Sequence, residues 1–196
     1  MRLSARYFLE RWKGVLRPVN FPDPAPSLPQ EATEFLTSFG LPAKVLIRCY
    51  NDITIDFFRE AIPLATIWEA DRERGFNWGS MPSEWTCYWH LGEVEYLQGG
   101  GWFCIEEVTG RLVVIDLDSS DPIYGVNASV GNFYAILGAF LDWSEEMSGE
   151  VEAISDLRDF LSQQTSVTFE ELEPFWINII DATLDQRAGM LSVTLS

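Results

Sequence analysis

Residues 102–117 read Trp-Phe-Cys-Ile-Glu-Glu-Val-Thr-Gly-Arg-Leu-Val-Val-Ile-Asp-Leu. Two apolar runs, 102–107 and 111–117, flank the pair Thr109-Gly110, and this spacing predicts a β-hairpin with a tight turn. Side chains alternate along each run, so both faces of the hairpin carry large apolar groups. A hairpin that is apolar on both faces is expected inside a sheet, with other elements covering it on both sides.

Further strands are expected on both sides of this hairpin. Apolar and β-branched residues predict strands over 53–58, 62–68, 86–91 and 123–126. The intervening residues 69–85 are polar and contain Gly and Pro, which indicates a long surface loop. The run Gly99-Gly100-Gly101 predicts a flexible turn before the hairpin.

Two helices enclose this series of strands. Pro29 to Phe39 has one apolar face and is followed by Gly40, a residue typical of the position after a last helical turn. A second helix is expected over about 130–143, with Asn127 or Ser129 as its cap. The order of helix, antiparallel strands and helix indicates an α+β fold with a mainly antiparallel central sheet flanked by helices.

The two ends of the chain differ in charge. Five basic residues and one acid give residues 1–17 a net charge of +4. Because the whole chain has a net charge of −17, the other 179 residues carry −21. The spacing of aromatic residues predicts a short basic amphipathic helix in residues 1–17. We expect this helix to pack its aromatic side on the domain; the alternative is that it anchors the protein to a surface or a partner. From Asp142 to Asp185 there are twelve acids and one base, on a pattern that predicts helices.

We therefore expect an N-terminal unit followed by one larger domain. Five prolines between the basic helix and the first domain helix indicate an extended strap. The expected boundaries are 1–29 for the helix and proline-rich connector, and 30–196 for the domain, with its core at about 32–143 and an acidic helical extension at 144–196.

Composition narrows the classes of partner and the location. Hydrophobic residues make up 47% of the chain and charged residues 22%, which is typical of a globular protein. Thirty acids against 13 bases argue against nucleic acid or an anionic membrane as a ligand and favour a basic partner. Cys49, Cys87 and Cys104 form no metal-binding or disulfide pattern, and the N-terminus does not resemble a signal peptide, so we expect a cytoplasmic protein.

The residue types that could support catalysis have simpler structural explanations. His90 is the only histidine, and we interpret it as a structural strand residue because nothing signals an oriented partner for it. Glu93, three residues further along the strand, is expected on the opposite face. Asp116, Asp118 and Asp121 could bind Ca²⁺ or Mg²⁺, but turn formation explains them better. We expect no catalytic residue, no metal and no cofactor.

Two groups of residues are candidates for binding a partner. Trp78, Trp85 and Trp102 adjoin loops or strand ends, where exposed tryptophan commonly anchors an interface. The acidic face of the C-terminal extension is either a solvated surface or a contact for a basic partner. Its residues are Glu145, Glu146, Glu150, Glu152, Glu170, Glu171 and Glu173.

Several motifs, taken in order, resemble the SUKH superfamily, and most closely its fourth subgroup of bacterial immunity proteins. The resemblance covers about residues 32–142; the basic N-terminal helix and proline strap lie outside the pattern, and the acidic tail is longer than expected of a minimal member. The matching residues are Gly40, Leu41 and Pro42 after the first helix, Thr109, Gly110, Val114 and Asp116 in the hairpin, and Asn127, Ser129 and Phe133 at the start of the last core helix.

The resemblance implies a bacterial protein that binds and neutralises a cognate polymorphic toxin without catalysis of its own. Such toxins are often nucleases or nucleic-acid deaminases, whose basic grooves an acidic inhibitor would complement. A general interaction scaffold of the same fold is the first alternative, and a small hydrolase using His90 or Asp116 is the second. The sequence leaves the oligomeric state open.

Overall fold

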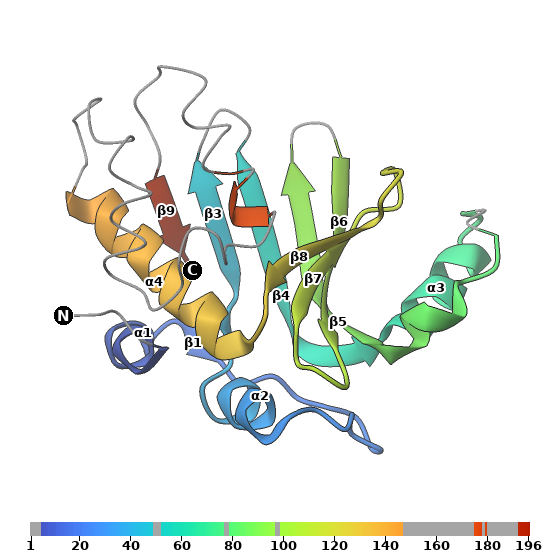
Figure 1. Cartoon of the computed structure of the whole chain (residues 1–196), viewed down its shortest axis with the longest axis horizontal. Coiled ribbons are helices and arrows are strands. Elements are labelled where there is room, and N and C mark those ends of the chain that lie inside the picture. The colour runs from blue at the N-terminus through green and yellow to red at the C-terminus, as the bar shows by residue number, and fades with distance from the viewer. Residues whose placement is uncertain are drawn as a thin grey trace.

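The computed structural model of the chain describes residues 5–48, 52–76, 79–96, 99–146, 175–177, 179 and 192–196. It shows a curled antiparallel sheet with flanking helices, the α+β fold that the sequence predicts (Figure 1). The elements are α1 Ala5–Trp12, β1 Leu16–Arg17, α2 Gln30–Glu34, the π-helical turn η1 Phe35–Phe39, β2 Leu41–Pro42, β3 Lys44–Arg48, β4 Ile53–Pro63, α3 Leu64–Glu73, the 3-10 helix η2 Ser83–Cys87, β5 Tyr88–Tyr96, β6 Gly99–Glu106, β7 Leu112–Ile115, β8 Ile123–Asn127, α4 Val130–Glu146 and β9 Ser192–Leu195. Residues 175–177 and 179 are also helical.

The main sheet places its strands in the order β8-β7-β6-β5-β4-β3-β9, and every neighbouring pair is antiparallel. From β3 to β8 each strand pairs with the next along the chain, as in a meander. Strand β9 returns from the C-terminus to pair with β3, with Val45 opposite Leu195. The tail was predicted to be helical, so this terminal strand corrects that expectation for residues 192–195.

The predicted central hairpin is confirmed as β6 and β7. Trp102 lies opposite Ile115 and Cys104 opposite Val113. The turn closes through a hydrogen bond from the Gly110 amide to the Glu106 carbonyl at 2.9 Å. Buried apolar clusters lie on both faces of this hairpin, as its sequence predicts.

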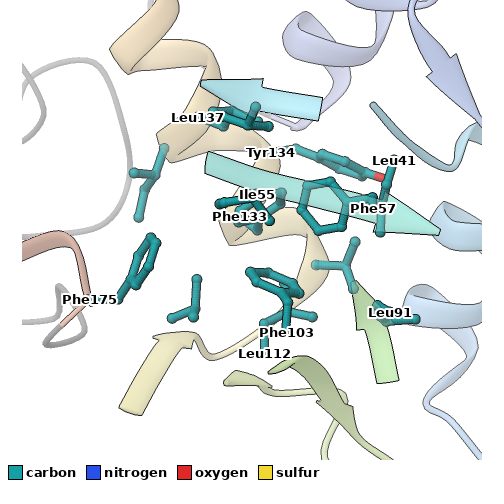
Figure 2. Packing of buried hydrophobic residues seen from close by; sticks show 14 of the residues in the cluster. Leu41, Ile55, Phe57, Leu91, Phe103, Leu112, Phe133, Tyr134, Leu137 and Phe175 are labelled. Atoms are coloured by element: carbon teal, nitrogen blue, oxygen red, sulfur yellow. The ribbon is translucent and has the colours of Figure 1, made fainter. Parts of the chain in front are cut away.

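The larger cluster lies between the first face of the sheet and helix α4. At its centre, the rings of Phe57, Phe103 and Phe133 meet edge to face, with centroids 4.9 to 6.0 Å apart. Phe133 comes from α4, and Phe57 and Phe103 come from β4 and β6, on either side of Gly92 in β5. This contact therefore holds the helix on the sheet. Figure 2 shows these rings together, with Phe175 approaching from the C-terminal helical segment.

The smaller cluster covers part of the second face, where α3 and η2 pack. Trp68 of α3 and Trp85 of η2 meet edge to face at 5.7 Å, and Trp68 also contacts Trp102 of β6 at 6.2 Å. Figure 1 shows α3 at the opposite end of the molecule from α1 and α4. The two faces of the sheet are thus covered by different helices at different ends.

Three predictions of local structure need correction. Residues 62–68 do not form one strand, because β4 ends at Pro63 and α3 begins at Leu64. The predicted loop 69–85 is shorter than expected, because α3 continues to Glu73 and η2 begins at Ser83. The run Gly99–Gly101 is not a turn but the first part of β6, paired with Val94, Glu95 and Tyr96 of β5.

The basic N-terminal helix packs on the domain, as the first of the two sequence interpretations proposes. The Phe8 ring is buried and stacks on Tyr134 of α4 at 5.2 Å. Gly138 makes room for it, since a Cβ there would lie 3.1 Å from the Phe8 ring. Arg11 pairs with Asp142, so the basic side of α1 meets an acidic group of α4.

The proline-rich segment lies along the domain surface. Its first residues are tied down by backbone hydrogen bonds from Val19 to Leu36 at 2.8 Å and from Asn20 to Arg59 at 2.7 Å. The Val19 side chain is buried in the same core as Phe8. Residues 5–29 therefore contribute directly to packing of the main sheet.

Candidate functional site

The first family-motif residues hold two elements close together. Gly40 has φ +83°, and a Cβ there would lie 1.7 Å from the Arg17 carbonyl oxygen. Only glycine tolerates both conditions. The Tyr134 hydroxyl donates to the Gly40 carbonyl. Leu41 and Pro42 are buried and form β2. This motif therefore fixes the approach of α4 to the N-terminal strands.

The hairpin motif serves turn formation. The Thr109 hydroxyl donates to the Glu106 carboxylate and accepts a hydrogen bond from the Arg111 amide at 3.1 Å. Gly110 has φ +71°, which favours glycine. Asp116 accepts a hydrogen bond from the Asp118 amide at 2.9 Å, which is the turn geometry that the sequence interpretation preferred for these carboxylates.

The third motif starts helix α4 and fastens the C-terminal segment. Ser129, one of the two candidates, is the cap, because its hydroxyl accepts a hydrogen bond from the Asn132 amide at 3.1 Å. Asn127 instead accepts a hydrogen bond from the indole of Trp176 at 2.9 Å. Phe133 is fully buried. The motif residues thus shape the fold, and the functional surface has to be sought elsewhere.

The open part of the second sheet face carries two rows of side chains, fixed by the strand register. One row runs Lys44, Asp56, Glu93, Trp102, Ile115 across β3 to β7. The row beside it runs Leu46, Thr54, Glu95, Gly100. Directly paired residues project to the same face. The apolar end of this face meets α3, whereas Glu93 and Glu95 are exposed.

A hollow of about 360 Å³ lies where these two rows meet the end of α3. We call it the Trp102 hollow. Its charged and aromatic lining comes from four parts of the chain: Glu93 and Glu95 of β5, Trp102 of β6 and, at its rim, Asp71 of α3 and Asp118 of the loop after β7. The backbone of Gly99–Gly101 completes the wall. The hollow is therefore acidic, with one indole in its lining.

The carboxylates of the hollow are only partly neutralised. Asp71 pairs with Arg74 at 3.3 Å. Glu93 and Glu95 make no ion pair within the part of the chain that the structure describes. Glu93 moreover lies directly opposite Asp56, which pairs with Lys44 at 3.4 Å. Like charges in directly opposed positions destabilise a sheet, so this surface retains a cost that a cation would relieve.

The structure distributes the predicted partner-binding residues unevenly. Trp102 lines the hollow and is partly exposed. Trp85 is only 5% exposed and packs on Trp68, so it offers little surface to a partner. Trp78 lies outside the described residues, as do Glu150, Glu152, Glu170, Glu171 and Glu173. Glu145 and Glu146 belong to the last turn of α4.

His90 lies on the second face, enclosed by aromatic rings. A bulge in β5 makes Leu91 an extra residue, so His90 pairs with Cys104 and Glu93 with Trp102. Cys104 and Trp102 are two residues apart and share a face. His90 and Glu93 therefore share it too, and the prediction that they lie on opposite faces is wrong because it assumed unbroken alternation.

The chemistry of His90 is that of a buried neutral ring. Its side chain contacts Phe58 and Trp102, with ring centroids 5.3 and 6.4 Å away, and neither ring nitrogen has a hydrogen-bond partner among the described residues. Burial lowers its pKa to about 4. Burial also raises the pKa of the neighbouring Cys104 thiol well above its usual value. Within the described part of the chain, no polar side chain orients this ring in the way that a general base requires.

Two searches for other kinds of site concern the described residues only. They contain no group of three or more His, Cys, Asp or Glu side chains that could hold a metal ion. None of their helices has the length and apolar character needed to cross a membrane.

Comparison with known proteins identifies a family. The protein-family model described as SUKH-4 immunity protein matches residues 5–176 of this chain. The match includes α1 and the proline-rich segment, which the sequence interpretation placed outside the family pattern. Searches of curated proteins and of solved structures found no match.

Proposed function

Because the chain belongs to the SUKH-4 immunity protein family, we propose that it binds the toxic domain of a cognate polymorphic toxin and blocks its active surface. The family assignment supports an immunity role, and we propose that the chain fulfils it by binding. The remaining question is which surface of this chain meets the toxin, and what chemistry that toxin presents.

The open, acidic part of the second sheet face is our proposed toxin-binding surface. The observation that supports it is the pair of exposed, unneutralised carboxylates, Glu93 and Glu95, beside the partly exposed Trp102. Aromatic side chains are enriched among residues that dominate binding energy. Carboxylates around such an anchor select a basic partner and accelerate its association.

A toxin that acts on nucleic acid fits this surface. Nucleases and nucleic-acid deaminases hold the phosphate backbone in grooves rich in Arg and Lys. An acidic protein that covers such a groove excludes the substrate without having to reach the catalytic residues. A cation of the partner beside Asp56 and Glu93 would also offset the repulsion between these two directly opposed carboxylates.

Co-expression tests this proposal. A candidate toxin domain from a neighbouring gene is expressed from an inducible promoter, with and without the immunity protein. Growth of the cells and co-purification of the two proteins are measured. We expect growth only when the immunity protein is present, together with recovery of a stable complex. Unprotected cells and recovery of the immunity protein alone would contradict the proposal.

Charge-neutral variants locate the binding surface. Glu93→Gln with Glu95→Gln removes two negative charges from the sheet face, and Glu34→Gln with Glu60→Gln removes two exposed charges elsewhere. The acidic C-terminal candidates are tested by Glu145→Gln with Glu146→Gln. We expect only the first pair to weaken toxin binding strongly. A loss confined to the C-terminal pair would move the interface to the acidic extension.

A further inference from the structure

We infer that the Trp102 hollow receives one arginine side chain of the partner, with its guanidinium stacked on the indole and bonded to Glu93 and Glu95. This inference deepens the proposed function and rests on it for the identity of the partner. Its physical content, a preference of this hollow for a guanidinium group, can be measured on the immunity protein alone.

The strand register arranges four positions as the corners of a rectangle. Trp102 lies opposite Glu93, and Gly100 lies opposite Glu95. The two glutamates are two residues apart, about 7 Å along the strand, and project to the same face. Three corners carry large side chains and the fourth carries none. The missing side chain at Gly100 leaves space between the indole and the two carboxylates.

Gly100 keeps that corner empty for a steric reason. A Cβ at this position would lie 2.8 Å from the Val94 carbonyl oxygen, a backbone atom that cannot move away cheaply. On the other face, a Cβ at Gly101 would lie 2.7 Å from the Val114 side chain. The glycine run is therefore part of a strand that has to lie close to its neighbours, and the hollow is built into the sheet.

The spacing of the carboxylates favours a large cation over a metal ion. Within the described chain, no three of the acidic groups converge closely enough to hold a metal. Guanidinium is planar and carries five donors in a fork, so it can bond to two separate carboxylates while one face stacks on an indole. A lysine ammonium is a compact point charge and cannot make this combination of contacts.

The form of the hollow suits a side chain that projects from a protein. Its volume of about 360 Å³ is near the lower end of ligand sites, which span roughly 300–1,000 Å³. Ligand sites for small molecules are mostly apolar, with few polar groups, and bury their ligand. This hollow instead carries four carboxylates beside Trp102, Ile115 and Leu117. The rim residue Asp118 is exposed, so a second basic residue of the same partner would find a carboxylate at the edge.

Titration of the full ¹⁵N-labelled chain with three small probes tests the inference without a toxin. The probes are Nα-acetyl-arginine amide, the lysine equivalent, and the citrulline equivalent, which has nearly the same shape as arginine but no charge. The measured signals are the indole N–H of Trp102 and the backbone amides of Gly100 and Gly101. We expect saturable shifts with the arginine probe, at least about tenfold weaker binding of the lysine probe, and no saturation with citrulline.

Two double variants complete the test. Glu93→Gln with Glu95→Gln should weaken binding of the arginine probe by at least about tenfold, whereas the control Glu34→Gln with Glu60→Gln should leave it unchanged. Equal binding of arginine and lysine, equal loss in both variants, or shifts centred away from Trp102 would each overturn the inference. Protection of cells from the toxin is measured separately. If the wild-type chain gives no protection but still binds the arginine probe selectively, the proposed function is refuted and the arginine inference is not.

Discussion

At the scale of single residues, His90 couples stability to pH. Its ring is 1% exposed, and burial lowers its pKa from 6.5 to about 4. Below pH 6.5 the unfolded chain binds a proton that the folded chain does not bind until about pH 4. The unfolded state therefore gains protons first, and the free energy of unfolding falls as the pH decreases through this window.

Replacement of His90 by phenylalanine should remove this dependence. At pH 5 the wild-type chain loses about 2 kcal/mol of stability through His90 relative to pH 8, whereas His90→Phe loses nothing from this site. Denaturant unfolding at several pH values gives the free energy of unfolding of both proteins. In the difference between them, the contributions of the carboxylates that both proteins contain cancel. Parallel curves for the two proteins would show that His90 is not buried as described.

Single residues also show where prediction from sequence succeeds and fails. The alternation in the hairpin placed Phe103 and Cys104 on opposite faces correctly, because that strand is regular there. The bulge at Leu91 was not predictable, since one extra residue leaves no mark in the pattern. Glu93 and Glu95 were missed as site residues because an alternation of acid and apolar residues also describes an ordinary solvated strand.

At the scale of elements, a buried hydrogen bond joins β8 to the C-terminal helical segment. The Trp176 indole donates to Asn127, and both residues are buried. Asn127→Ala leaves the indole N–H without its partner and should cost about 2 kcal/mol of stability. In a Trp176→Phe background, which lacks the N–H, the same substitution should cost clearly less. A double-mutant cycle measures this coupling, and additive losses would contradict it.

Helix α1 is predicted to stabilise the whole fold. Phe8→Ala removes a fully buried ring that stacks on Tyr134, and should lower the free energy of unfolding by about 3–5 kcal/mol. Lys13→Ala, at an exposed position just after the helix, should change it by less than about 0.5 kcal/mol. Thermal or denaturant unfolding distinguishes the two. Equal, small effects would show that α1 does not contribute to the core.

Elements with a regular pattern were predictable, and those set by distant contacts were not. The apolar stripe of α4 and the two runs of the central hairpin are local signals. The apolar and β-branched residues in 62–68 suggest a strand, yet β4 ends at Pro63. Leu64 and Trp68 lie one helical turn apart in α3, and both pack in the smaller cluster. Strand β9 depends on pairing with β3, far away in sequence, which no local pattern reports.

At the scale of the whole molecule, the net charge is −17, and within the described part of the chain the exposed Glu93 and Glu95 lie beside Trp102 without an ion pair. We propose that this surface favours a basic partner. Exposed charges are screened over about 10 Å at 0.1 M salt. A toxin complex formed at this surface should therefore associate more slowly as salt increases, while its dissociation rate changes less.

The most direct test of this account is the association rate constant of the toxin domain, measured from roughly 0.05 to 0.5 M salt. The account predicts a steep decrease for the wild-type chain and for Glu34→Gln with Glu60→Gln, and a slower, much less salt-dependent rate for Glu93→Gln with Glu95→Gln. A rate that is independent of salt, or equally steep in all three proteins, would contradict it.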